Sequence, residues 1–125
     1  MSTEPTYFYD KEVDILYISF APGEKANAAV ELNENILLRL NKKERRAIGL
    51  TLMDFSLLVQ LTNMGQRSFP LSGLADLEPE WREMVLDIIT QPPVNAILKV
   101  LAYTPSLTET IPITLVESPS LPLAA

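Results

Sequence analysis

Apolar residues in the first half of the chain recur at every second position, in short runs separated by turn-forming residues. Such alternation places successive side chains on opposite faces of a β-strand. The runs predict strands over about residues 6–9, 13–20, 26–32, 36–40 and 48–53. The charged turn before the last run predicts a β-hairpin, and the series predicts an antiparallel β meander. Apolar residues occupy both faces of residues 13–20, a pattern typical of a central strand covered on both sides.

The spacing of apolar residues becomes helical at Asp54. Asp54 or Ser56 is available as the N-cap of a first helix, and Gly65 is a plausible stop signal. The residues that share this spacing are Phe55, Leu58 and Val59, and Thr62 would continue it.

A single apolar stripe predicts a second helix over about residues 77–90. We expect Asp76 to cap it, Pro79 to lie in its first turn, and Pro92 and Pro93 to follow its end. The stripe consists of Leu77, Trp81, Met84, Val85, Ile88 and Ile89. We expect this helix to pack on the sheet through its stripe, with Trp81 in the core.

The last third of the chain is predicted to form a C-terminal β-hairpin. Residues 111–116 alternate as a strand, and Pro112 indicates a sheet edge or a bulge. Residues 97–103 fit helical or strand spacing, but the strand at 111–116 needs a partner. The Pro/Leu tail at 118–123 is expected to be extended.

These elements predict a single α+β domain over residues 1–125. It combines a β meander (7–60) with a second part (61–125) that holds a helix, a hairpin and an extended tail. One or two helices are expected to pack on the meander. No internal repeat or linker divides the 125 residues.

Composition removes several kinds of chemistry. The chain has no Cys and no His, so thiolate and imidazole groups are unavailable as nucleophiles, bases or metal ligands. Its formal charge of −6 argues against nucleic-acid binding through a broad basic face. The one basic cluster, at residues 42–46, is expected to be a solvated turn. We therefore expect no metal or other cofactor and no nucleic-acid partner.

Hydropathy predicts a soluble, cytoplasmic protein. No apolar run approaches the ~20 residues that a membrane-spanning helix needs. The first residues lack the positive and apolar regions of a secretory signal.

Two ordered motifs lie in the first half of the chain. The first is the stretch Tyr-Asp-Lys-Glu-Val-Asp-Ile-Leu-Tyr-Ile at residues 9–18, and the second is Ile-Gly-Leu-Thr-Leu-Met-Asp-Phe-Ser at 48–56. Together they resemble a prokaryotic family known as domain of unknown function 2283. The resemblance covers about residues 7–60 and implies a small antiparallel β domain. Val13, Thr51 and Phe55 depart from the residues common in the family. The resemblance implies no enzymatic activity.

Three carboxylates form the one candidate polar site. By alternation, Asp14 and Asp54 would both point inward at strand ends, with Asp10 in the neighbouring turn. Facing carboxylates could perform acid–base chemistry or hold Mg²⁺ or Ca²⁺. The structural alternative is that Asp10 accepts turn hydrogen bonds, Asp14 begins a strand and Asp54 caps the first helix. We favour the structural interpretation.

Three hypotheses for function follow. The first is a non-enzymatic interaction module that self-associates as a homodimer and serves an unidentified protein partner. Two-sided apolar strands and an apolar tail exceed what a small monomer covers. The second is an antitoxin-like acidic protein that neutralises a basic RNA-cleaving toxin. The third is a carboxylate-based, metal-dependent enzyme.

The ligand inventory gives a first prediction. Calorimetric titration with Zn²⁺ or Ni²⁺ is expected to show no stoichiometric sub-micromolar binding, because soft and imidazole ligands are missing. A stoichiometric tight-binding event would contradict this account.

Overall fold

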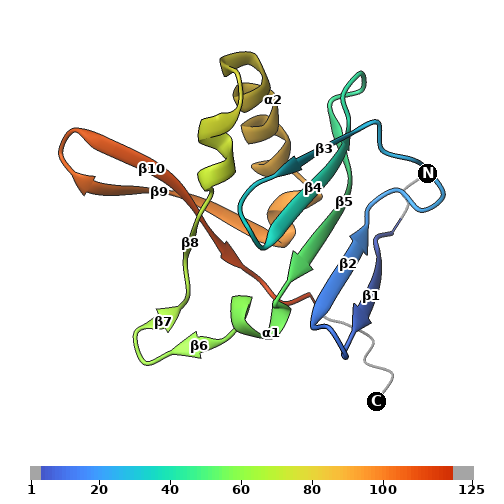
Figure 1. Ribbon diagram of the computed structural model, residues 1–125, viewed down its shortest axis with the longest axis horizontal. Coiled ribbons are helices and arrows are strands. Elements are labelled where there is room, and N and C mark those ends of the chain that lie inside the picture. Colours follow the sequence, from blue (N-terminus) through green and yellow to red (C-terminus); the bar gives the residue numbers. More distant parts are fainter. Residues whose placement is uncertain (1–3, 120–125) are drawn as a thin grey trace.

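A five-stranded antiparallel sheet is the largest element of the fold (Figure 1). The computed structural model describes residues 4–119. The sheet consists of β1 (Thr6–Asp10), β2 (Ile15–Ser19), β3 (Ala28–Glu31), β4 (Ile36–Asn41) and β5 (Arg46–Met53). Its order is β1-β2-β5-β4-β3, so β3, β4 and β5 form a meander and the β1–β2 hairpin joins it through β5. The predicted antiparallel sheet is confirmed.

The rest of the chain adds helices and two small sheets. In chain order the elements are α1 (Phe55–Leu58), β6 (Leu61–Thr62), β7 (Gly65–Gln66), β8 (Phe69–Pro70), η1 (Ser72–Asp76), α2 (Pro79–Ile89), η2 (Val94–Ala96), β9 (Leu98–Ser106) and β10 (Glu109–Val116). Strands β6 and β7 form a hairpin, and β8, β10 and β9 form a three-stranded sheet in that order. The predicted α+β class and C-terminal hairpin are confirmed, and residues 97–103 are mostly strand.

The core lies between the inner face of the five-stranded sheet and α2. Alternate residues of β2, β4 and β5 are fully buried there, and α2 adds Val85 and Ile89. The sheet residues with no exposed surface are Leu16, Ile18, Ile36, Leu38, Leu40, Leu50 and Leu52. Burial of aliphatic side chains is the main term that favours this fold.

The ends of α2 differ from the prediction in one respect. Pro79 occupies the first turn, where its missing N–H costs nothing, but the N-cap is Glu78 and no side chain caps the helix. Asp76 ends η1 instead, because the chain is extended at Leu77 and Glu78. Arg82 joins the two helices by donating hydrogen bonds to the carbonyl oxygens of Leu74 and Leu77, at 3.0 and 2.9 Å.

Trp81 is half-buried and not a full core residue. It packs at the margin of the core, and the Lys42 ammonium lies 4.5 Å from its ring centroid. A cation over an aromatic face is attracted by the ring quadrupole. The prediction that α2 packs through its stripe holds for Val85 and Ile88, which are buried, and only partly for Trp81.

The first predicted helix ends after one turn, so its extension to Gly65 was wrong. The segment turns back as the β6–β7 hairpin, with Gly65 at a φ of 109°. The Thr62 hydroxyl accepts from the Met64 N–H at 3.1 Å and donates to the Gly65 carbonyl oxygen at 2.8 Å. Local hydrogen bonding by a Thr hydroxyl and the conformational freedom of Gly favour this turn over a helix.

Strand β2 is covered on one face only, and the expectation of cover on both sides was wrong. Its other face carries Tyr17, which is 39% exposed and stacks on Phe8 of β1 with ring centroids 6.0 Å apart. Phe8 is itself 62% exposed. Val13 lies in the preceding turn and not in the strand.

Strand β10 is the central strand of its sheet, so the prediction of an edge position for Pro112 was wrong. The expected bulge is present next to it, between Glu109 and Ile111. Pro112 lies just beyond the short ladder with β8, where its carbonyl oxygen accepts from the Leu71 N–H at 3.0 Å. Because β8 pairs only with Ile113 and Thr114 of β10, no ladder hydrogen bond from residue 112 to β8 is needed, and a proline is tolerated there.

Two remaining expectations concern the tail and the membrane. Most of the predicted extended tail at 118–123 lies outside the described residues. Within residues 4–119, no helix has the length and apolar character required to cross a bilayer.

A core truncation tests this packing. Ile89→Ala is expected to lower the free energy of unfolding by about 2–5 kcal/mol, because Ile89 has no exposed surface and its loss leaves a cavity. Leu61→Ala is the control: Leu61 is 72% exposed, so the expected change is within ~0.5 kcal/mol. Urea unfolding followed by circular dichroism measures both, and equal effects would contradict the assigned core.

Candidate functional site

Asp14 lies in the turn between β1 and β2, and the prediction that it belongs to a strand was wrong. Its φ of 56° is left-handed, a conformation that Asp and Asn adopt more readily than most residues. This conformation removes its side chain from the alternation of β2. The carboxylate instead faces Tyr9 of β1 and Ser56 of α1.

Both oxygens of the Asp14 carboxylate accept hydrogen bonds. The Tyr9 hydroxyl donates to Oδ1 at 2.6 Å, and the Ser56 hydroxyl donates to Oδ2 at 2.6 Å. The Ser56 backbone N–H donates to both oxygens, at 3.0 and 3.2 Å. The Asp14 carbonyl oxygen also accepts from the Phe55 N–H at 3.0 Å. We call Tyr9, Asp14 and Ser56 the Asp14 cluster; it caps α1 with an acid 42 residues away in sequence.

Asp54 occupies the N-cap position of α1 without capping it by its side chain. Its φ is 55°, and it makes no side-chain cap hydrogen bond. Its Oδ2 instead accepts from the Asn35 side-chain amide at 2.9 Å, and the same amide donates to the Met53 carbonyl oxygen at 3.1 Å. The expected inward direction of Asp54 was therefore wrong, and its side chain anchors the turn before β4.

Asp10 has a third, separate set of contacts. Its Oδ1 accepts from the Glu12 backbone N–H at 3.1 Å, as expected for a turn aspartate. The three carboxylates of the candidate site are thus held by different partners. Among residues 4–119, no group of three Asp or Glu is arranged so that it could hold a metal ion.

The hydrogen bonds of the Asp14 cluster lower the pKa of Asp14 and raise the pKa of Tyr9. Donation by Ser56 and then by Tyr9 lowers the pKa of the Asp14 carboxyl below its ordinary value of 3.8. The bond to Asp14 raises the pKa of the Tyr9 hydroxyl above its ordinary value of 10.0. Asp14 is therefore held ionised and Tyr9 protonated at neutral pH. A carboxylate with a lowered pKa and both oxygens engaged is a poor general acid or base, whereas it is well suited to capping a helix.

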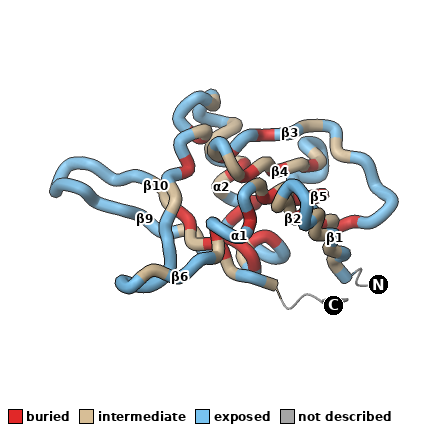
Figure 2. The backbone as a smooth tube through the Cα atoms, turned by 60° about the horizontal axis from the view of Figure 1, so that its bottom comes forward, coloured by how far each residue is buried: buried red, intermediate tan, exposed pale blue. Residues whose placement is uncertain are grey.

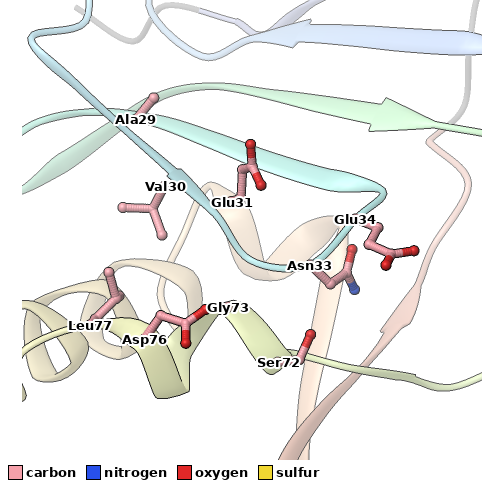
Figure 3. Close-up of a pocket in the computed structure, with 9 residues that line it drawn as sticks. All are labelled: Ala29, Val30, Glu31, Asn33, Glu34, Ser72, Gly73, Asp76 and Leu77. Atoms are coloured by element: carbon pink, nitrogen blue, oxygen red, sulfur yellow. The ribbon is translucent and has the colours of Figure 1, made fainter.

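A hollow of about 410 Å³ lies between the β3–β4 connection and η1 (Figure 3). Glu31, Glu34 and Asp76 line it, but their carboxylates do not point to one common position in Figure 3. Its floor depends on Gly73, whose N–H donates to the Leu32 carbonyl oxygen at 2.8 Å. A Cβ at this position would lie 1.8 Å from the Glu31 carbonyl oxygen, so only Gly allows η1 to approach β3 so closely.

The basic cluster of the β4–β5 turn is paired with acids and an aromatic ring. Arg46 forms ion pairs with Glu24 and Glu44, and Lys42 lies over Trp81. Arg45 is 4.0 Å from Asp87. This arrangement agrees with the expectation of a solvated turn. Most of the positive charges of the turn have a partner within the chain.

Sequence reasoning missed Tyr9, Ser56 and Asn35 as partners of the candidate carboxylates. One signal in the sequence was that Asp14 and Asp54 both lie next to predicted turns. An Asp in a turn tolerates a positive φ, which takes its side chain out of the strand alternation. Which distant donor each acid meets depends on the strand order, since β2 pairs with β5 and so brings the β1–β2 turn next to α1.

The Asp14 cluster gives a pH-dependent prediction. Because the folded pKa of Asp14 is lowered, its stabilisation is present above 3.8 and is lost as the pH falls through the folded pKa. Because the pKa of Tyr9 is raised, its contribution is present below 10.0 and is lost as the pH rises through the folded pKa. Asp14→Asn is expected to lower the free energy of unfolding at neutral pH. It is also expected to make that free energy depend less on pH in the acid range.

Asp54→Asn is the matched control. It also places Asn at a left-handed position, and its side-chain oxygen still accepts from Asn35. Urea unfolding at a series of pH values compares the two variants. Similar losses in both would show that the Asp14 cluster has no special role.

Comparison with known proteins identifies the segment that holds this cluster. Residues 7–56 match the model of a family described as "Protein of unknown function (DUF2283)". Searches of the curated proteins and of the solved structures found no match. The matched segment runs from β1 through β5 into α1, so it includes all of the Asp14 cluster. The resemblance inferred from the two motifs is confirmed, since residues 7–56 match the model of this family and include both motifs.

Proposed function

We propose that the protein is a non-enzymatic interaction module that associates with itself as a homodimer. The observation that carries this proposal is the amount of large hydrophobic surface exposed on the described residues. In the two patches described next, the exposed side chains are Phe8 and Tyr17 of the five-stranded sheet and Leu101, Tyr103, Leu107 and Ile111 of the β9–β10 hairpin. Scattered exposed apolar residues are normal, but contiguous patches mark interaction sites.

The outer face of the five-stranded sheet is one such patch. Register places Phe8, Tyr17, Thr51 and Leu37 in one row across four strands. Arg39 lies beside this row with its guanidinium over Gly49, where a Cβ would lie 2.6 Å from Nη2. The Arg39 Nε is buried and has no hydrogen-bond partner among the described residues.

The β9–β10 hairpin is a second patch. Leu101 and Tyr103 of β9 lie opposite Ile113 and Ile111 of β10, so the four side chains share one face of the hairpin. Leu101 and Tyr103 are 50% and 53% exposed. This face presents apolar side chains without a covering element in the described chain.

The carboxylate geometry favours a structural role over catalysis. A carboxylate-based enzyme requires Asp10, Asp14 and Asp54 to converge, whereas Glu12, Ser56 and Asn35 hold them separately. The lowered pKa of Asp14 also opposes proton donation near neutral pH.

Light scattering coupled to size exclusion tests the proposal. At micromolar concentration the expected mass is twice the 13.9 kDa of one chain. The dimer is expected to persist near 1 M salt, where the Debye length is about 3 Å, because screening weakens ion pairs and leaves apolar burial intact. The mass of a single chain in low and high salt would overturn the proposal. Dissociation in high salt alone would show that charged residues hold the interface.

A further inference from the structure

The β9–β10 hairpin extends away from the rest of the chain as a two-stranded arm (Figure 1). Its distal half is exposed on both faces, and Figure 2 shows it pale blue over most of its length. From Leu101 to Ile111 every residue is exposed. An isolated two-stranded ribbon is marginally stable in water, because it has no core of its own.

The composition of the arm does not match that of a solvated loop. Between Val100 and Val116 the only charged residue is Glu109, in a chain with a formal charge of −6. Apolar and hydroxyl side chains make up most of the remainder. A foreign partner that recognised the arm through charge would find almost nothing to pair with.

Within residues 4–119, strand β9 also has one edge that pairs with no other strand. It is nine residues long and forms the outer strand of its sheet. Natural edge strands are usually short, charged or interrupted, because a free edge pairs readily with another strand. Here the single charge is Lys99 at the base, and the single proline is Pro105 near the tip.

The free edge has a defined centre at Ala102. Ala102 lies opposite Pro112, whose carbonyl oxygen points toward β8 and accepts from the Leu71 N–H. In an antiparallel pair the N–H and C=O of one residue point to the same side, so the Ala102–Pro112 pair does not exchange hydrogen bonds. The N–H and C=O of Ala102 therefore face the free edge, and by alternation so do those of Val100.

A hollow and a knob lie at the two ends of this edge. The hollow, about 230 Å³, lies at the base of the arm and is lined by Thr90, Asn95, Leu98, Lys99, Val100 and Leu101. The knob is Leu107 in the turn at the tip, whose side chain is fully exposed.

We propose that two copies of the chain associate by antiparallel pairing of β9 with the partner's β9, about a two-fold axis at Ala102. This inference rests on the proposed self-association and assigns the surface that performs it. Ala102 is the middle residue of β9, so the axis places Ser106 opposite the partner's Leu98. Leu107 then reaches the hollow at the base of the partner's arm, because β9 spans about 30 Å at 3.4 Å per residue.

A second copy fits this surface better than a foreign strand does. A two-fold axis makes one patch complementary to itself, so the knob of each copy meets the hollow of the other. The paired edges would join two three-stranded sheets into one of six strands. The apolar faces formed by Leu101, Tyr103 and Ile111 in each copy would then be continuous across the axis.

Disulfide trapping tests the register directly, because the chain contains no other Cys. Ala102→Cys is expected to form a covalent dimer under mild oxidant, since hydrogen-bonded antiparallel pairs have Cα atoms about 5.5 Å apart, within disulfide range. Thr104→Cys is the matched control on the same arm. It would lie opposite the partner's Val100, so the two introduced Cys residues of a dimer would be too far apart to form a disulfide. Met64→Cys, at a residue 91% exposed on the β6–β7 hairpin, controls for random collision.

A second pair of variants tests the knob. Leu107→Lys is expected to weaken dimerisation at least tenfold, with the circular dichroism spectrum unchanged, because it places a second positive charge in the hollow that the partner's Lys99 lines. Met64→Lys adds the same charge away from the arm and is expected to leave the dimer intact.

The outcomes separate the two proposals. A dimeric wild type in which Ala102→Cys does not cross-link, or cross-links no faster than Thr104→Cys, overturns the arm pairing and leaves self-association standing. A dimer that tolerates Leu107→Lys overturns the role of Leu107. A monomeric wild type overturns both proposals. Selective cross-linking at Ala102 together with weakened association of Leu107→Lys supports the arm as the dimer interface.

Discussion

Burial of one face of the five-stranded sheet is the constraint on which the rest of the structure depends. Alternate residues of β2, β4 and β5 are aliphatic and fully buried, and α2 covers them with Val85, Ile88 and Ile89. Among residues 4–119 the longest helix is α2, which has eleven residues and covers one face of the sheet. In this part of the chain the outer face therefore keeps Phe8 and Tyr17 exposed, and no element covers the β9–β10 arm.

Strand order decides where the polar residues meet. Because β2 pairs with β5, the turn that precedes β2 lies beside the helix that follows β5. Asp14 can therefore cap α1 although 42 residues separate it from Ser56. The pairing of β4 with β5 brings Asn35 to Asp54 in the same way, so two acids that resemble a catalytic pair in sequence serve two different junctions. Both hold the corner where the sheet ends and the second half of the chain begins.

Local pattern was sufficient to predict most of the elements. Alternation gave the strands of the sheet, and the apolar stripe of α2 was read correctly at Val85, Ile88 and Ile89. The errors have physical causes that act over longer distances or through single side chains. Thr62 and Gly65 form a hairpin turn where helical spacing suggested a longer α1. The positive φ of Asp14 removes it from the strand to which parity had assigned it. Strand order cannot be obtained from periodicity, so neither the partner of Asp14 nor the exposed face of β2 was accessible to sequence reasoning.

The central claim is that the free edge of β9 pairs with the same edge of a second copy of the chain. Hydrogen–deuterium exchange at several protein concentrations tests it at the level of single amides. In a monomer the N–H groups of Val100 and Ala102 face solvent, whereas in the paired arms they are hydrogen-bonded. We expect their exchange to slow markedly as concentration rises, while the Met64 amide in the β6–β7 turn exchanges at an unchanged rate. Exchange at Val100 and Ala102 that is equally fast at every concentration would contradict the account.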